Sequence, residues 1–210
     1  MGLAASLIIS CSALIVSGLT AWWTLFRRGT LKMTQPSVVF FGPDEKGNAK
    51  VFFRTLLYST ARRGQVVESM FVKLRREGET QIFSVWVYGE TKALVRGSGL
   101  FVGYEGMAAN HHFLLPKEGP EYKFWTGTYL VEVYAKLVNC EQLVSLWRHE
   151  LAVGQSEALA LIKDEFGLYF DWNPDVKEYA HTLDRNGLNG GKLTRMFEAE
   201  QKKARGEELA

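Results

Sequence analysis

The chain has 210 residues and a nearly balanced charge, with 25 Lys and Arg against 23 Asp and Glu and a net charge of +2. A nucleic-acid-binding surface would show a concentrated basic excess, so this balance argues against a nucleic acid as a partner. The two cysteines, Cys11 and Cys140, fall in different parts of the chain, one in an apolar run and one in the polar remainder. We therefore expect no intramolecular disulfide, which fits a reducing compartment.

The first predicted element is a membrane-spanning helix from Leu3 to Phe26. This run contains no Asp, Glu, Lys, Arg, His, Asn or Gln. At about 1.5 Å per residue it would extend roughly 36 Å, more than the hydrocarbon core of about 30 Å requires. Trp22 and Trp23 lie near its end, where indole rings favour the headgroup layer, and Arg27 and Arg28 follow at once. The sequence therefore predicts a transmembrane helix with these four residues at its membrane interface.

Three other interpretations of this segment are weaker. A cleaved secretory signal would have a basic start and a shorter apolar run, and no Lys or Arg occurs in the first 26 residues. Ile8-Ile9-Ser10-Cys11 resembles a bacterial lipoprotein box, but the apolar run continues past the cysteine. Gly2 with Ser6 fits the myristoylation pattern, which a spanning helix would make redundant. We therefore assign residues 1–28 to a signal-anchor that crosses the membrane once.

The flanks of the predicted span indicate its orientation. Basic residues follow it, Arg27, Arg28 and Lys32, and none precedes it. The positive-inside rule therefore places the rest of the chain in the cytoplasm. Small residues recur at every fourth position of the span: Ala13, Ser17 and Ala21. This spacing is compatible with weak homo-oligomerisation through the helix, although small residues are common in membrane helices.

From Gln35 to Val153 the pattern changes to short runs rich in Val, Phe, Tyr, Leu and Trp, separated by turn residues, which is typical of antiparallel strands. We expect the runs 66–75 and 80–88 to form a hairpin, and the glycine-rich run 94–103 to be a bulged or edge strand. The complete set of predicted strands is 37–41, 50–59, 66–75, 80–88, 94–103, 107–115, 127–137 and 143–153. About eight strands at regular spacing predict a mainly β fold, an antiparallel sandwich.

One strand of this set has a familiar pattern. The segment Gly127-Thr128-Tyr129-Leu130-Val131-Glu132-Val133-Tyr134-Ala135 resembles the Gly-x-Tyr-x-Val-x-Val strand of many immunoglobulin-like and fibronectin-like sandwiches. The resemblance implies a sandwich of that architecture. The cysteine and tryptophan framework of antibody domains is missing, because Cys140 has no partner in the soluble part. The resemblance covers one strand and assigns no functional residue.

The chain after the strands is expected to be partly helical. A short helix at 156–166, with Ser156 as its N-cap, should pack on the sandwich and end at Gly167. A loop and a charged helix at 192–205 should follow, whose apolar edge includes Phe197. The predicted parts are the anchor 1–28, a juxtamembrane linker 29–34, the sandwich 35–172 with its packed helix, and a C-terminal extension 173–210.

Chemistry-bearing patterns are sparse. His111 and His112 are neighbours in a predicted strand, so they point to opposite faces and cannot chelate one metal together. The segment 171–175 begins like a calcium loop but has Val176 where that loop requires glycine. No nucleophile elbow, phosphate-binding loop, dinucleotide fingerprint or zinc-binding helix motif occurs. We expect no enzymatic activity and no metal, cofactor or catalytic site.

The remaining functional signal is aromatic. Trp86, Tyr88 and Tyr134, together with Phe197, form a candidate partner surface if they share an exposed face. The leading hypothesis is a single-pass membrane protein whose cytosolic sandwich binds another protein as an interaction or scaffold subunit. The alternative is a sandwich that binds a lipid or carbohydrate on the outer side of the membrane. An enclosed apolar pocket of about 300 Å³ or more would favour that alternative.

Overall fold

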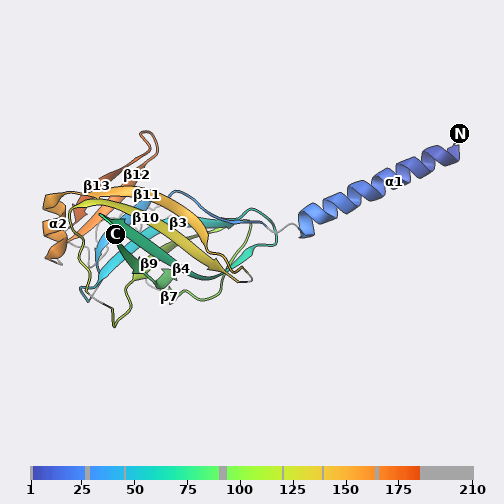
Figure 1. The fold of residues 1–210 in the computed structure, drawn as a ribbon. Helices are drawn as coiled ribbons and strands as arrows, with labels where there is room; N and C mark the ends of the chain where they lie inside the picture. Colours follow the sequence, from blue (N-terminus) through green and yellow to red (C-terminus); the bar gives the residue numbers. More distant parts are fainter. Residues whose placement is uncertain are drawn as a thin grey trace, which may run out of the picture.

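The computed structural model describes residues 2–26, 29–44, 46–89, 94–119, 121–138, 140–163 and 166–184. It consists of an N-terminal helix and a mainly β domain, in which two antiparallel sheets of eight and five strands pack as a sandwich (Figure 1). The predicted fold class, a mainly β sandwich preceded by an apolar helix, is confirmed at this level.

The N-terminal helix α1 (Gly2–Ala21) continues into a π-helical turn at Trp22–Phe26. None of its apolar window is buried within the chain. The hydroxyl groups of three residues on it donate hydrogen bonds to carbonyl oxygens four residues earlier: Ser12, Thr20 and Thr24. An exposed helix of this length and composition, with these three hydroxyl groups satisfied internally, suits a signal sequence or a membrane anchor.

The larger sheet has β3 (Ala49–Ser59) near its centre, with β2 and then β12 on one side and β9 and then β6 on the other. Its edges are β13 and β7, and the short β1 pairs with the end of β3. The other strands are β1 (Leu31–Met33), β2 (Val38–Pro43), β6 (Val85–Gly89), β7 (Val95–Arg96), β9 (Met107–Leu114), β12 (Gly167–Asn173) and β13 (Glu178–Asp184).

The smaller sheet is built on β4 (Gln65–Arg76) and β10 (Gly127–Leu137), which pair along most of their length. β11 (Val144–Val153) flanks β10, while β5 (Glu79–Phe83) and β8 (Leu100–Val102) pair with opposite ends of β4. Helix α2 (Gln155–Ile162) follows β11 and precedes β12.

Rows of alternate residues on the long strands build much of the core between the sheets. Along β10 the residues of one face are all buried: Tyr129, Val131, Val133, Ala135 and Leu137. β3 alternates in the same way, with Phe53 and Leu57 fully buried. Each such aliphatic or aromatic side chain contributes about 1.5 to 3 kcal/mol when removed from water. The sandwich is therefore held mainly by these facing rows.

Two predicted strands are each divided between the sheets. The run 80–88 forms β5 in the smaller sheet and β6 in the larger one, with the crossing at Ser84. The run 94–103 similarly contains β7 and β8. The predicted hairpin is correct for β4 and β5. The crossing between sheets was not predicted, because the apolar pattern continues through Ser84 without a break. The immunoglobulin-like strand arrangement is not confirmed. The pattern of a single strand indicates which of its residues alternate between two faces, but it contains no information on the order of strands in a sheet.

Three predicted boundaries differ from the structure. The linker 29–34 contains strand β1, whose Leu31 lies in the core. Helix α2 has Gly154 and not Ser156 as its N-cap, because the Glu157 carboxylate accepts the Gly154 N–H at 2.6 Å. The larger sheet continues through β13 to Asp184, beyond the predicted end at 172, because β13 pairs in full with β12. The predicted helix 192–205 lies outside the described residues.

Candidate functional site

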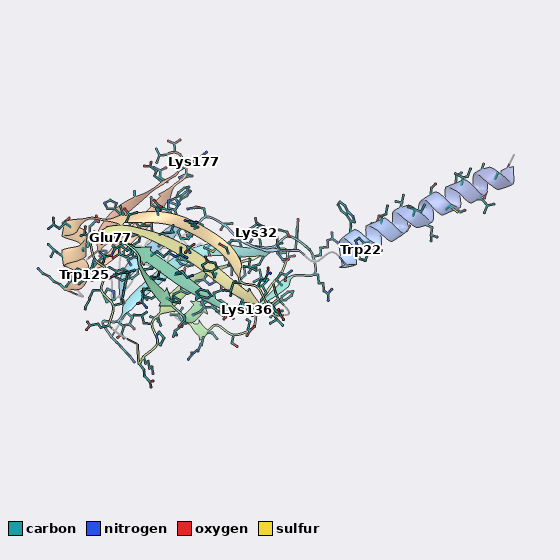
Figure 2. All side chains as sticks on the ribbon, viewed as in Figure 1. Trp22, Lys32, Glu77, Trp125, Lys136 and Lys177 are labelled. Carbon is teal, nitrogen blue, oxygen red and sulfur yellow. The ribbon has the colours of Figure 1, made fainter. Side chains whose placement is uncertain are left out.

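The sandwich has two ends with different surroundings. The chain enters it from α1 at Gly29, next to the turn that joins β3 and β4, and we call this the entry end. β4 runs from there to Arg76 at the opposite end, which we call the distal end. Figure 2 shows Lys32 and Lys136 toward the entry end and Glu77 and Trp125 at the distal end.

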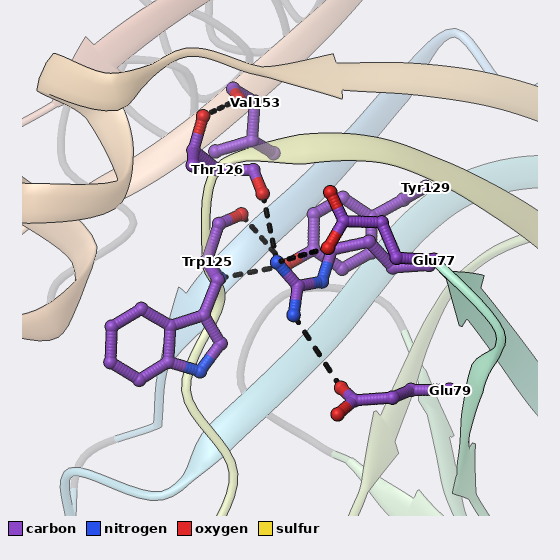
Figure 3. Close-up of polar contacts among 7 residues, drawn as sticks. Glu77, Glu79, Trp125, Thr126, Tyr129 and Val153 are labelled. Carbon is purple, nitrogen blue, oxygen red and sulfur yellow. Dashed lines mark hydrogen bonds and ion pairs between the residues drawn. The ribbon is translucent and has the colours of Figure 1, made fainter.

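Arg76 is the centre of a polar network at the distal end (Figure 3). Its Nη1 donates to the Thr126 carbonyl oxygen at 2.9 Å, and its Nη2 lies 3.4 Å from Glu79 Oε2. A second carboxylate, Glu77, lies 3.7 Å from Nη1, and the guanidinium group sits over the Tyr129 ring. The Arg76 side chain is only 15% exposed. Two carboxylates thus lie beside this cation, and its hydrogen bond to Thr126 connects the β4–β5 turn with the segment before β10.

The segment that carries Trp125 is fixed by two neighbouring strands. Tyr129 is fully buried at the start of β10, and its hydroxyl group accepts the Trp125 N–H at 2.7 Å and donates to the Trp125 carbonyl oxygen at 2.8 Å. Thr126 Oγ1 donates to the Val153 carbonyl oxygen at the end of β11. Tyrosine corners of β-sandwiches use the same device, a tyrosine hydroxyl bound to backbone a few residues upstream. The backbone under Trp125 is therefore held from the core.

The Trp125 indole, in contrast, is half exposed. Its side chain is at 50% relative exposure, and Figure 3 shows the ring directed away from the Arg76 network. Exposed tryptophan on a fixed backbone is uncommon on a soluble surface and is enriched at interaction sites.

A cleft of about 330 Å³ lies beside the network. It is lined by Leu74, Arg76, Glu79, Thr80, Gln81 and Tyr122. Burial raises the pKa of Tyr122 far above its ordinary value of 10, so its phenol stays neutral at physiological pH. Only one lining residue, Leu74, is aliphatic, so the cleft does not have the enclosed apolar lining expected of a lipid-binding sandwich.

The predicted partner surface does not form one patch. Trp86 is buried, at 3% exposure, and donates its Nε1 hydrogen to His111 Nδ1 at 3.1 Å. Tyr88 stacks on Trp86 and is half-buried. Tyr134 belongs to β10 in the other sheet, where its hydroxyl group donates to Glu132. Trp86 therefore belongs to the core, since its indole N–H finds an internal acceptor. Phe197 lies outside the described residues.

The predicted membrane-interface residues are partly described. Trp22 and Trp23 are 61% and 66% exposed in the π-helical turn that ends the N-terminal helix. Arg27 and Arg28 lie outside the described residues. Sequence reasoning did not include Trp125 in the candidate partner surface. The signal that marks it is Tyr129, four positions later at a strand start, which fits a tyrosine corner.

The two neighbouring histidines point to opposite faces, as predicted, and both are neutral. Burial lowers the pKa of His111 to about 4. Burial, with smaller contributions from Lys50 and His111, lowers the pKa of His112 to about 3. His112 stacks on Phe52 with the ring centroids 4.8 Å apart. Within the described ranges no group of three or more His, Cys, Asp or Glu side chains could hold a metal ion, and the absence of a metal or cofactor remains a prediction.

Comparisons with known proteins add little. No protein-family model matches the chain, and no curated protein matches it significantly. Among solved structures, the chain is similar to a family 123 glycoside hydrolase from Clostridium perfringens, studied for glycolipid glycan hydrolysis. The identity is 9%, the match covers 60% of this chain and 27% of that enzyme, and the TM-score is 0.35. The chain thus spans about a quarter of the enzyme's length, and this likeness carries no functional argument.

Proposed function

We propose that the protein is a single-pass membrane protein whose β-sandwich binds a protein partner through its distal end, as an interaction or scaffold subunit. The observation that carries this proposal is the Trp125 indole, half exposed on a backbone fixed by Tyr129. A tryptophan presented in this way loses little conformational freedom on binding and can bury a large apolar area. Such residues supply a disproportionate share of binding energy at protein interfaces.

The charges around Trp125 suggest what the partner presents. The side chains of Glu77 and Glu79 are 71% and 78% exposed and flank the half-buried Arg76. An apolar recess for the indole, rimmed by Lys or Arg, would complement this surface. The neighbouring cleft, whose lining is mostly polar, gives no support to a lipid ligand, and a carbohydrate ligand on the outer side of the membrane stays the alternative.

Photocrosslinking tests the proposal directly. A photoreactive phenylalanine analogue replaces Trp125 in the full chain, expressed in its native cells, and a matched variant carries it at Val176, which is 60% exposed on the β12–β13 turn. We expect one protein to be crosslinked from position 125 and not from position 176. Trp125→Ala should then weaken binding of that purified partner at least about 30-fold, the effect of a 2 kcal/mol hot spot. Identical crosslinks from both positions, or unchanged affinity, would refute the assignment.

The second part of the proposal concerns location. We propose that α1 is retained as an anchor and that the sandwich lies in the cytosol, because Arg27, Arg28 and Lys32 follow the helix. A membrane-impermeant maleimide tests this on Cys140 in a Cys11→Ala background, with a denatured sample as control for thiol access. Labelling only after cell lysis is expected. Labelling of Cys140 in intact cells would show that the sandwich lies outside the cytosol and would refute this orientation.

A further inference from the structure

The first described residues after the N-terminal helix, Gly29 and Thr30, are fixed to the entry end of the sandwich. Gln65 Nε2 donates to the Gly29 carbonyl oxygen at 2.7 Å, and the Thr30 N–H donates to Thr60 Oγ1 at 2.8 Å. The Thr60 N–H donates back to the Thr30 carbonyl oxygen at 3.0 Å. A Cβ on Gly29 would lie 2.5 Å from the Ala61 nitrogen, so only glycine fits there. The chain is thus part of the sandwich from Gly29 onward.

Little chain separates this fixed point from the predicted membrane span. The helical segment ends at Phe26, and only Arg27 and Arg28 lie between it and Gly29. Three virtual bonds of 3.8 Å span at most about 11 Å. The headgroup region adds about 5 to 8 Å on each side of the hydrocarbon core. If α1 is the anchor proposed above, the entry end therefore lies at the headgroup layer or within a few Å of it.

The turns exposed at the entry end carry aromatic and basic side chains. Phe101 and Tyr104 are 59% and 64% exposed on β8 and on the turn that follows it. Arg62 and Arg63 are exposed on the β3–β4 turn. The Phe101 ring lies against Gly64, where an added Cβ would come within 2.5 Å of it, so it is adjacent to this basic turn. These four residues define the entry-end patch.

Sheet register places the patch beside the point of chain entry. Ser59, at the end of β3, pairs with Leu31, and its N–H donates to the Gly103 carbonyl oxygen directly before Tyr104. Val66 pairs with Phe101, and its carbonyl oxygen accepts the N–H of Val138, another exposed apolar residue. The exposed apolar and basic groups therefore lie together on the end that the two-residue connection holds near the bilayer.

We infer that the entry-end patch is a lipid-binding surface, which rests on the anchoring proposed above. Phe101 and Tyr104 sit at the boundary between headgroups and acyl chains, and Arg62 and Arg63 pair with lipid phosphates. Aromatic rings favour this layer, and arginine is attracted to anionic headgroups. This interaction fixes the orientation of the sandwich relative to the bilayer. The eleven residues of β3 extend roughly 37 Å, at about 3.4 Å per residue, between the entry end and the distal end. Trp125, at the distal end, is then held away from the membrane surface.

Depth-dependent fluorescence quenching tests this inference on the full chain in nanodiscs that contain phosphatidylglycerol. In a Cys11→Ala, Cys140→Ser background, an NBD label is attached to Tyr104→Cys or, as the matched control, to Glu118→Cys. Glu118 is equally exposed, but its turn follows the distal end of β9. A headgroup spin label should quench position 104 at least threefold more strongly than position 118. Equal quenching at the two positions would overturn the inference.

Two further arms separate the possible failures. If the intact chain is released from cell membranes by alkaline carbonate, the anchoring proposal fails, whatever the nanodisc result. If it resists extraction and position 104 is not quenched, only the lipid-binding surface fails. Arg62→Glu with Arg63→Glu should at least halve the quenching at position 104 in anionic nanodiscs and reduce it less in zwitterionic ones, whose phosphate charge is balanced by the choline group. Unchanged quenching in anionic nanodiscs would overturn the pairing of these arginines with phosphate.

Discussion

The hydroxyl group of Tyr129 binds both backbone polar groups of Trp125, accepting its N–H and donating to its carbonyl oxygen. One buried side chain thereby fixes the peptide that presents the most exposed tryptophan of the described β domain. Tyr129→Phe should remove both hydrogen bonds without changing the ring packing. Because the two backbone groups lose their partner, we expect a loss of about 1 to 3 kcal/mol in the free energy of unfolding.

Urea unfolding of the full chain in detergent measures this loss. Tyr58→Phe is the matched control, since the Tyr58 hydroxyl group has no hydrogen-bond partner within the described parts of the chain. It should change stability by less than about 0.5 kcal/mol. Partner binding should also weaken in Tyr129→Phe, because Trp125 is less well ordered. Equal stability of the two variants would show that the clamp contributes nothing.

The buried histidines predict a loss of stability in mild acid. In the folded state the pKa of His111 is about 4 and that of His112 about 3, against 6.5 when unfolded. Between pH 6.5 and 4 the unfolded chain therefore binds more protons, and stability falls as the pH is lowered. From pH 7 to pH 5 each histidine should cost about 2 kcal/mol. Urea unfolding at pH 7 and at pH 5 measures this difference as a shift in the unfolding midpoint.

His112→Phe isolates one of these contributions. Phenylalanine can keep the stacking on Phe52 and does not titrate. The difference in unfolding free energy between pH 7 and pH 5 should therefore be about 2 kcal/mol smaller than in the natural chain. A variant with the same pH dependence as the natural chain would mean that His112 is protonated as easily when folded as when unfolded.

Glu157 connects α2 with the edge strand β13. Its Oε2 accepts the Gly154 N–H, and its Oε1 lies 2.9 Å from His181 Nε2. Glu157→Ala should lower stability by about 1 to 2 kcal/mol, because the helix loses the acceptor at its N-cap. Hydrogen exchange should become faster in α2 and in β13. Ser156→Ala is the control and should change stability little. If both substitutions lowered stability equally, Ser156 and not Gly154 would be the N-cap.

Gly97 leaves room for the Trp86 ring. A Cβ at this position would lie 2.0 Å from Trp86 Cε3, closer than any packed atoms approach. Gly97→Ala should therefore displace the indole or the strand and cost about 1 to 3 kcal/mol. Ser98→Ala, one residue away and exposed, should have little effect. The midpoints of thermal unfolding compare the two variants, and equal midpoints would contradict the packing described here.

Alternation made part of the fold predictable. β10 has one face in the core, so burial repeats every second residue from Tyr129 to Leu137, and its pattern indicates both the strand and its inner face. β13 gave no such signal, because as an edge strand it is mostly exposed, with Tyr179 half-buried. The crossing at Ser84 was not predictable either, since an alternating run does not reveal which sheet each half joins.

The candidate site was less predictable for a physical reason. Trp86 and Trp125 have the same side chain, and their surroundings in the folded domain decide which one is exposed. Gly97 and His111 cover Trp86 from elsewhere in the chain, whereas Tyr129 binds only the backbone of Trp125 and leaves its indole in water. Trp86 therefore has no marker beside it in the sequence, whereas Trp125 is marked by Tyr129, four positions later at a strand start.

The most direct test of the account is the mass of the protein recovered from native membranes after alkaline carbonate extraction. We predict that the carbonate-resistant pellet contains the intact chain, including residues 1–26, because α1 is a retained anchor. A protein that begins after residue 26 and is found in the soluble fraction would show that the helix is a removed signal sequence, and would contradict both the anchoring and the lipid-facing entry end.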